Sequence, residues 1–150
     1  MINDQELKEL TRKLKLKYKE VERCTKEYQY YSDELNKLNF ELNSSIESNV
    51  EEYYINKTKG NIKDTESTQD NSKKKLSKGY DELLVLIEKT NSIGVLSDEL
   101  NEILQASIKA KNKGQEILYP EQSNENNIVE LSKMSISENE KSNSEKKEEP

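Results

Sequence analysis

The stretch that decides the fold is residues 7–42, LKELTRKLKLKYKEVERCTKEYQYYSDELNKLNFEL. It contains no glycine or proline, and its apolar and aromatic residues recur about every 3.5 residues, the period of a coiled-coil seam. They are Leu7, Leu10, Leu14, Tyr18, Val21, Cys24, Tyr28, Tyr31, Leu35, Leu38 and Leu42. The pattern predicts one long helix over residues 5–46. Its seam must pack on another helix, because a helix of this composition is not stable alone.

The composition of the 150 residues limits what the remainder of the chain can be. Hydrophobic residues make up 31% and charged residues 36%, with one Phe, no Trp and no His. Four Gly and two Pro are too few for the turns of a strand-rich protein. The lone Cys24 cannot form an internal disulfide or a multi-cysteine zinc site, and its place on the seam predicts a buried structural thiol. Long charged helices are therefore expected.

Two further helices follow the first. The polar residues 43–49 break the chain, and a second helix is predicted over residues 50–90, with Ser48 or Asn49 as its N-cap. Residues 63–75 of this segment contain no apolar side chain, and a disordered loop over residues 60–75 is the alternative to a continuous helix. Gly94 suits a left-handed cap in the next turn, and Ser97 suits the N-cap of a third helix over residues 96–117.

The three predicted helices have short connections, which favours up-down-up packing. The expected fold is all-α: an elongated antiparallel three-helix bundle, coiled-coil-like, over residues 1–119. Gly114 is expected to fray the third helix and Pro120 to end it. Residues 120–150 are rich in Glu, Ser, Asn and Lys, which predicts a disordered acidic tail. The small apolar island at 127–136 is interpreted as a less polar part of that tail, with a short docking motif as the alternative.

Several functional classes are disfavoured by the same residues. The chain has no glycine-rich phosphate loop and no nucleophile–base pair, and its carboxylates lie on charged helices without a pocket that could shift their pKa, so we expect no enzyme and no cofactor. The net charge of −6 does not favour nucleic acid as a partner. No apolar run approaches the roughly 20 residues that span a bilayer, and the polar N-terminus lacks a signal-peptide core. A soluble cytoplasmic or nuclear protein is expected.

A candidate binding face lies on the first helix, opposite its seam. Positions two residues beyond each seam residue lie roughly 200° around the helix. The basic and apolar residues of this face are Arg12, Leu16, Lys19, Arg23, Lys26, Tyr30, Lys37 and Phe40. Glu9, Glu20 and Asp33 fall on it too, so the face is basic on balance and not purely basic. One interpretation is a solvated charged face whose apolar members contact the third helix. The other is a surface for an acidic protein, with Tyr30 and Phe40 as anchors and the basic residues steering association.

Three blocks of sequence resemble the tubulin-binding cofactor A family. The first runs from Leu14 to Leu35, where a lysine-rich helix start is followed by an aromatic centre. The second is Val50–Lys57, in which glutamates precede paired tyrosines, an aliphatic residue and a lysine. The third is Tyr80–Leu83 with Ile87–Lys89. The order and spacing of these blocks match the family from about Leu14 to Lys89. The chain departs from it at residues 67–72, which are wholly polar where the family has apolar residues and a proline.

The resemblance implies a non-enzymatic chaperone in the cytoplasm, associated with the cytoskeleton. Members of this family capture partly folded β-tubulin and hold it on the route to the α/β-tubulin heterodimer, without nucleotide or metal. The implied partners are β-tubulin and other tubulin-folding cofactors. Tubulin is acidic, which suits the basic face of the first helix. The chain itself is expected to be a monomer or a homodimer.

A second hypothesis comes from the seam alone. A coiled-coil subunit of a multiprotein assembly, of the kinetochore or vesicle-tethering type, would complete its seam with another chain. Such a subunit should be largely unfolded by itself or should self-associate, so that its stability depends on concentration. A self-contained bundle should fold cooperatively. The polar stretch at 63–75 favours the assembly subunit, and the ordered resemblance favours the chaperone.

Overall fold

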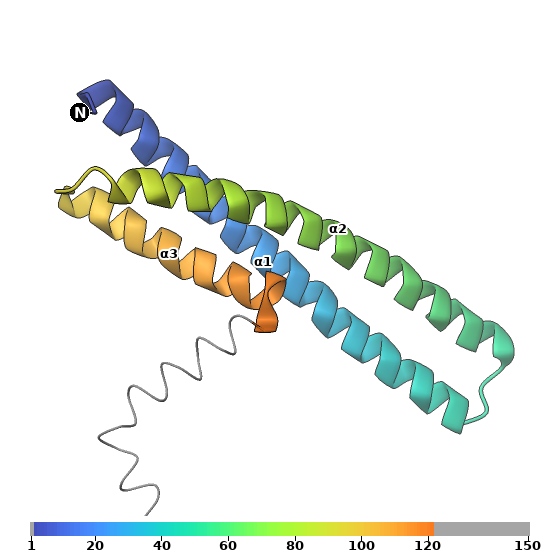
Figure 1. The fold of residues 1–150 in the computed structure, drawn as a ribbon. Coiled ribbons are helices and arrows are strands. Elements are labelled where there is room, and N and C mark those ends of the chain that lie inside the picture. The colour runs from blue at the N-terminus through green and yellow to red at the C-terminus, as the bar shows by residue number, and fades with distance from the viewer. Residues whose placement is uncertain (1, 122–150) are drawn as a thin grey trace, which may run out of the picture. The chain divides into compact units, whose positions relative to one another are not determined.

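Three α-helices make up the fold of the computed structural model, which describes residues 2–121 (Figure 1). They are α1 (Asp4–Glu47), α2 (Glu52–Asn91) and α3 (Asp98–Leu118), and no strand occurs among the described residues. The predicted all-α three-helix bundle is confirmed. Among the described residues, 2–114 belong to one compact unit and 115–121 to a second. Pro120 and Glu121 are helical, so the prediction of disorder is wrong for these two residues. The remainder of the predicted acidic tail and its apolar island lie outside the described residues.

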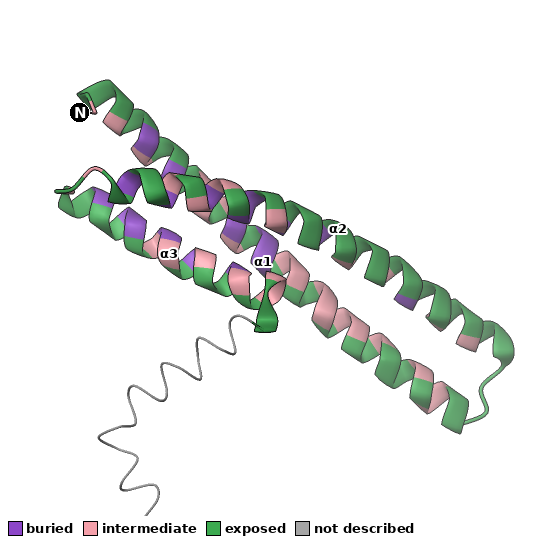
Figure 2. Cartoon of the chain, viewed as in Figure 1, coloured by how far each residue is buried: buried purple, intermediate pink, exposed green. Residues whose placement is uncertain are grey.

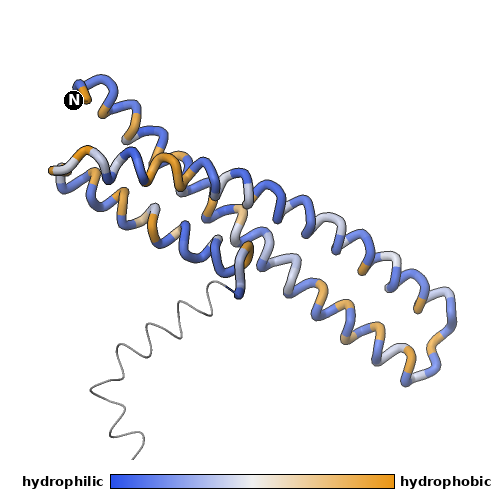
Figure 3. The backbone as a smooth tube through the Cα atoms, viewed as in Figure 1, coloured by the Kyte–Doolittle hydropathy of each residue, from blue (hydrophilic) through white to orange (hydrophobic). Residues whose placement is uncertain are grey.

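The predicted seam of α1 faces the other helices along its whole length. All eleven seam residues from Leu7 to Leu42 are buried or half-buried. The hydrophobic segments that recur along α1 in Figure 3 belong largely to this seam. The helix starts slightly earlier than predicted, because Asn3 caps it: the Asn3 Oδ1 atom accepts a hydrogen bond from the Glu6 backbone N–H at 2.8 Å.

Helix α2 is continuous through the polar stretch, so the loop alternative for residues 63–75 is wrong. The residues that face inward keep steps of three and four along the helix, although several of them are polar. The inward series is Ile55, Thr58, Ile62, Thr65, Gln69, Ser72, Leu76, Gly79, Leu83, Leu86 and Thr90. Small and polar side chains therefore occupy the inward positions where apolar residues are missing, and the helical period persists through them.

One hydrogen bond joins α1 to α2 within this polar stretch. The Gln69 Nε2 atom donates to the Ser32 Oγ atom at 2.6 Å. Ser72, one turn further along α2, is buried. No buried side-chain nitrogen or oxygen among the described residues lacks a hydrogen-bond partner, so this part of the interface carries no unsatisfied polar group.

Helix α3 buries both large and small residues, and at Gly114 it lies against both other helices. Its buried residues within the first unit are Leu100, Ile103, Leu104, Ser107, Ala110 and Gly114. A Cβ atom added to Gly114 would lie 3.5 Å from side-chain atoms of Val21 and Leu76 and 3.6 Å from the Tyr80 ring. The expectation that Gly114 frays the helix is wrong, because this glycine is buried in a close contact and α3 continues to Leu118.

Burial is concentrated where α3 lies beside the α1–α2 pair (Figure 2). In α1 the last fully buried residue is Thr25, and from Tyr28 onward the seam is only half-buried. We call residues 28–72, the part of the hairpin beyond this core, the arm. In the arm only Ile62 and Ser72 are buried. A seam that packs on only one other helix stays partly exposed to solvent, which is why burial is incomplete in the arm.

The two turns differ in how well their capping residues were predicted. Ser48 caps the C-terminus of α1 and Asn49 has a left-handed φ of 57°, so neither is the N-cap of α2. The N-cap position of α2 is taken by Glu51, which makes no side-chain capping bond. The helix starts later than predicted because the chain uses Ser48, Asn49 and Val50 to reverse direction. The predictions for the other turn are confirmed. Gly94 has a φ of 95°, and Ser97 Oγ accepts from the Leu100 N–H at 3.1 Å.

The glycines of α2 allow a test of how closely the helices approach. Gly60 has open space around it, and we expect Gly60→Ala to raise the free energy of unfolding by about 1 kcal/mol through helix propensity alone. Gly79→Ala has the same propensity gain, but its Cβ would lie 3.3 Å from the Val21 Cγ2 atom. We expect a smaller gain from Gly79→Ala in urea unfolding. An equal or larger gain would show that α1 and α2 are less closely packed there.

Candidate protein-binding surface

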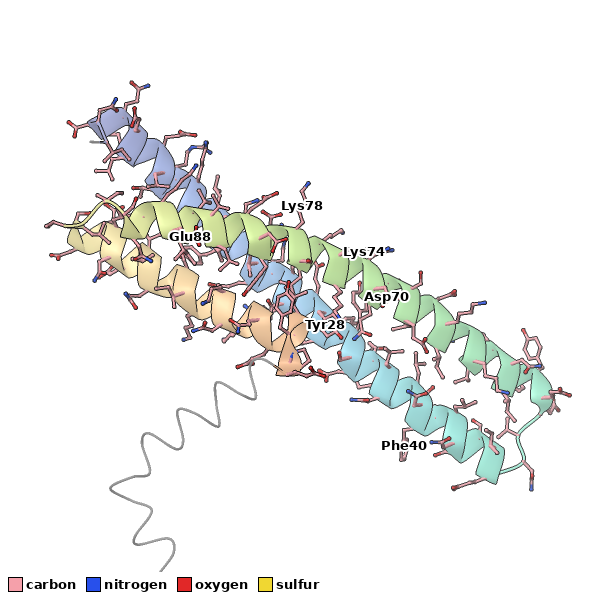
Figure 4. All side chains as sticks on the ribbon, viewed as in Figure 1. Tyr28, Phe40, Asp70, Lys74, Lys78 and Glu88 are labelled. Carbon is pink, nitrogen blue, oxygen red and sulfur yellow. The ribbon has the colours of Figure 1, made fainter. Side chains whose placement is uncertain are left out.

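The outer face of α1 carries all eight residues that the sequence singled out. Each of them is exposed, and we call this set the outer face: Arg12, Leu16, Lys19, Arg23, Lys26, Tyr30, Lys37 and Phe40. Leu16 is 57% exposed, Tyr30 59% and Phe40 74%. Phe40 projects outward from α1 on the side away from α2 (Figure 4). These apolar side chains are therefore available to a partner. The face extends over residues 12–40, roughly 42 Å of helix, so it is a stripe rather than one pocket.

Only part of the positive charge on the outer face is neutralised within the chain. Arg12 Nη2 lies 2.5 Å from Glu9 Oε1, and this hydrogen bond lowers the pKa of Glu9 and raises that of Arg12. Lys37 lies 3.7 Å from Glu34. Among the described residues, no carboxylate lies within 4.0 Å of the other cations of the face, which are Lys19, Arg23 and Lys26. The face therefore presents net positive charge to an approaching partner.

A groove between α1 and α2 adjoins the outer face. Its lining residues from α1 are Arg12, Lys13, Leu16, Lys17 and Glu20, and those from α2 are Glu82, Val85 and Leu86. A second hollow shares Lys13 and Leu86 with it and continues along Ile2, Asn3, Gln5, Glu6, Glu9, Leu10, Lys89, Ser92, Ile93 and Val95. We call the two together the α1–α2 groove. It combines apolar side chains with charged ones.

Lys17 ties the two walls of the groove together. Its Nζ atom lies 2.7 Å from Glu20 Oε2 on the same helix and 2.5 Å from Glu82 Oε2 on α2. The hydrogen bond to Glu20, followed by that to Glu82, raises the pKa of Lys17, and the hydrogen bond from Lys17 lowers the pKa of Glu82. Lys17 is thus fully occupied within the chain and Arg12 is paired with Glu9, which leaves Lys13 and Lys89 as the rim cations that can interact with a partner.

The groove was not predicted from the sequence, although the apolar residues of α2 gave an indication of it. The apolar run Leu83–Ile87 is wider than a single seam needs, and Val85 and Leu86 were not assigned to any face. Their partners on α1 could not be identified, because the pairing of the two helices depends on the α1–α2 turn and on the residue at each contact. Val85 is 50% exposed in the structure and lies beside Leu16, which the sequence did identify.

A further set of exposed apolar residues surrounds the α1–α2 turn. These residues, which we call the tip, are Phe40, Ile46, Val50, Tyr53 and Tyr54. The rings of Tyr53 and Tyr54 meet edge to face with centroids 5.3 Å apart. The exposed apolar side chains of the described chain therefore gather mainly at the groove and at the tip, and such gatherings are typical of binding surfaces.

Cys24 lies in surroundings that disfavour the ionised form of its thiol. Cys24 is buried on the seam, and burial, followed by the charge of Glu27, raises the pKa of its thiol. A thiol that is harder to ionise is a weaker nucleophile, in keeping with the structural role predicted for Cys24. Among residues 2–121, no group of three His, Cys, Asp or Glu side chains is arranged to hold a metal ion. No helix in this range has the length and apolar character needed to cross a bilayer.

A comparison with protein families identifies the chain. The family described as tubulin binding cofactor A matches residues 9–108, two thirds of the sequence. The chain belongs to the tubulin binding cofactor A family. The match spans α1, α2 and the first half of α3, and it includes the outer face and the groove residues from Glu9 to Val95. Searches of curated proteins and of solved structures each found no match.

Membership in the tubulin binding cofactor A family settles the general role. It is a family of tubulin-binding chaperones and not a known family of enzymes, which confirms the resemblance stated from the sequence. Tubulin is therefore the general partner of the chain. The sequence departure at residues 67–72 lies inside the match, and there the polar residues are accommodated in a continuous α2.

The ion pair across the groove predicts a pH-dependent stability. The pKa of Glu82 is lowered in the folded chain, so the ionised carboxylate stabilises the fold at pH values above the ordinary carboxyl pKa. This stabilisation is lost as the pH falls through the pKa that Glu82 has in the folded chain. We expect Glu82→Gln to lower the free energy of unfolding at pH 7 by at most about 1 kcal/mol, because the pair is partly exposed. The difference from wild type should shrink below about pH 4.

Urea unfolding at pH 7 and pH 3 measures this difference. Glu88→Gln is the matched control, because Glu88 is an exposed glutamate of the same helix and lies within 4.0 Å of no Lys or Arg nitrogen in the described chain. It should leave stability nearly unchanged at both pH values. A Glu82→Gln effect that is as large at pH 3 as at pH 7 would contradict the role of the ion pair.

Proposed function

We propose that the chain is a cytoplasmic chaperone that captures a β-tubulin folding intermediate and holds it on the route to the α/β-tubulin heterodimer. The observation that carries this proposal is the family match over residues 9–108. Other tubulin-folding cofactors are the further partners that this role requires. The chain acts by binding, as a monomer or a homodimer, and uses no cofactor.

The surface of α1 supports an acidic partner such as tubulin. Residues 8–26 contain eight basic and three acidic side chains, and two of those acids, Glu9 and Glu20, are engaged with basic residues of the same helix. Long-range attraction between this segment and an acidic protein raises the rate of association. Tyr30 and Phe40 on the same face supply aromatic anchors of the kind that dominate binding energy.

The packing of the described residues favours the chaperone over an assembly subunit. Along the first part of α1 the seam is closed by α2 and α3 of the same chain, with Leu14, Val21, Leu76 and Leu83 fully buried. A subunit that needed another chain to complete this seam would leave these residues exposed. The family match favours the same conclusion.

Capture from eukaryotic cytosol tests the proposal directly. With the purified chain as bait, we expect β-tubulin to be recovered in clear excess over α-tubulin, because a captured intermediate is not yet paired. Immunoblots for both tubulins measure the ratio. Recovery of a fixed set of coiled-coil proteins without tubulin would overturn the proposal and favour the assembly subunit.

Charge reversal tests the role of the outer face. We expect replacement of Arg12, Lys19, Arg23 and Lys26 by glutamate to weaken β-tubulin binding by roughly tenfold or more at low salt, with unchanged helicity by circular dichroism. The matched control reverses Lys57, Lys59, Lys63 and Lys73, which are exposed on α2 and give the same change in net charge. Binding that survives the first set at low salt, or that both sets weaken equally, would rule out steering by this face.

A further inference from the structure

The α1–α2 groove is the unfilled counterpart of the groove that α3 occupies. A pair of packed helices has a furrow on each flank, and α3 fills one of them, where Gly114 lies against Val21, Leu76 and Tyr80. Its buried positions include Leu100, Ile103, Ser107, Ala110 and Gly114, at steps of three and four. The other furrow is lined by α1, α2 and the residues that follow α2, and no residue of α3 lines it. The chain therefore shows what kind of element fits such a furrow: a helix with small and apolar residues at this spacing.

The groove exposes apolar surface that nothing in the described chain covers. Leu16 is 57% exposed, Val85 50% and Val95 96%, and Leu86 is half-buried between them. These side chains come from both walls and from the turn after α2. Apolar side chains that converge on a groove from separate segments are typical of sites that accept the apolar face of an amphipathic helix.

The charges at the rim specify the partner further. Arg12 and Lys13 stand on the α1 side and Lys89 on the α2 side. Lys15 and Lys19 lie on the adjoining surface of α1. Of the acids that line the groove, Glu9 is paired with Arg12, and Glu20 and Glu82 are paired with Lys17, while Glu6 has no basic partner within 4.0 Å in the described chain. The rim cations that an incoming helix with acidic residues beside its apolar stripe would meet are Lys13, 4.0 Å from Glu9, and Lys89 on the opposite rim.

We propose that the α1–α2 groove seats one amphipathic helix of the captured partner, with small or apolar residues at steps of three and four and acidic residues along both edges. The inference rests on the proposed function, since the partner is the tubulin chain that the outer face attracts. Leu16 belongs to both surfaces, so a partner steered to the outer face arrives beside the groove. Val85 and Leu86 then provide the apolar contacts of α2, and the Lys17–Glu82 pair holds the two walls at the spacing that receives the helix.

A substitution at Val85 tests the groove apart from the outer face. We expect Val85→Glu to weaken β-tubulin capture by roughly tenfold or more, because it places a charge on the apolar floor that the partner must cover. Gln105→Glu is the matched control, because it adds the same negative charge at an exposed position of α3 that lies outside the outer face, the groove and the tip. Both sites are exposed, so helicity by circular dichroism should not change.

A photo-crosslinking amino acid at position 85 identifies the occupant. During capture from cytosol, we expect it to crosslink to β-tubulin within a segment whose sequence has the amphipathic, acidic pattern described above, as read by mass spectrometry of the linked peptide. The same amino acid at position 105, on the exposed face of α3, should not reach that segment. A link from position 85 to a basic or non-helical segment would overturn the inference.

The outcomes separate the two proposals. If the wild-type chain captures β-tubulin and Val85→Glu captures it equally well, the groove inference is wrong and the proposed function stands. If Val85→Glu and Gln105→Glu weaken capture equally, the effect belongs to added negative charge and the groove inference is again wrong. If the wild-type chain captures no tubulin, both the proposed function and the inference fail.

Discussion

The length of α3 relative to the seam of α1 determines where this protein has a core and where it has a surface. Helices α1 and α2 have 44 and 40 residues, whereas α3 has 21. The seam is fully buried where α3 packs on the α1–α2 pair, at Leu14, Val21, Leu76 and Leu83. From Tyr28 onward the seam of α1 is only half-buried, so the arm follows from the difference in length. The groove has another origin, because it is the flank of the α1–α2 pair that no residue of α3 lines.

The seam of α1 and the eight residues of its outer face could be predicted because both depend on local helical period alone. Once the seam from Leu7 to Leu42 is identified, the opposite face follows by geometry. The continuity of α2 could not be predicted from apolar residues, because Thr65, Gln69 and Ser72 hold the inward positions in its middle. The groove could not be predicted, because its position depends on which α2 residues lie beside Leu16 and Lys17. That pairing is set by the tertiary structure. The start of α2 was misplaced because Asn49, a good N-cap by type, serves instead as the left-handed residue of the turn.

The Ser32–Gln69 hydrogen bond gives the α1–α2 pairing a specificity that an apolar seam lacks. Leucine-rich seams tolerate shifts of one heptad, because one leucine packs much like another. The part-buried amide of Gln69 meets its partner in a single register of the two helices. It therefore disfavours the shifted pairings, as buried polar residues do in other coiled coils. The net gain in stability from one such bond is small, about 1 kcal/mol, so its value lies in the choice of register.

The arm has a consequence for how the protein moves. Local opening of a folded chain costs less free energy where fewer apolar groups are buried, so backbone amides there exchange with solvent sooner than those of the core. Among residues 28–72 only Ile62 and Ser72 are buried, which places this hairpin at the low end of that scale. The part of the molecule beside α3 then behaves as a rigid base, and the arm behaves as a pair of helices that can separate and close again without global unfolding. A partner that binds across both helices of the arm would slow this opening, and its binding would be linked to the ordering of the arm.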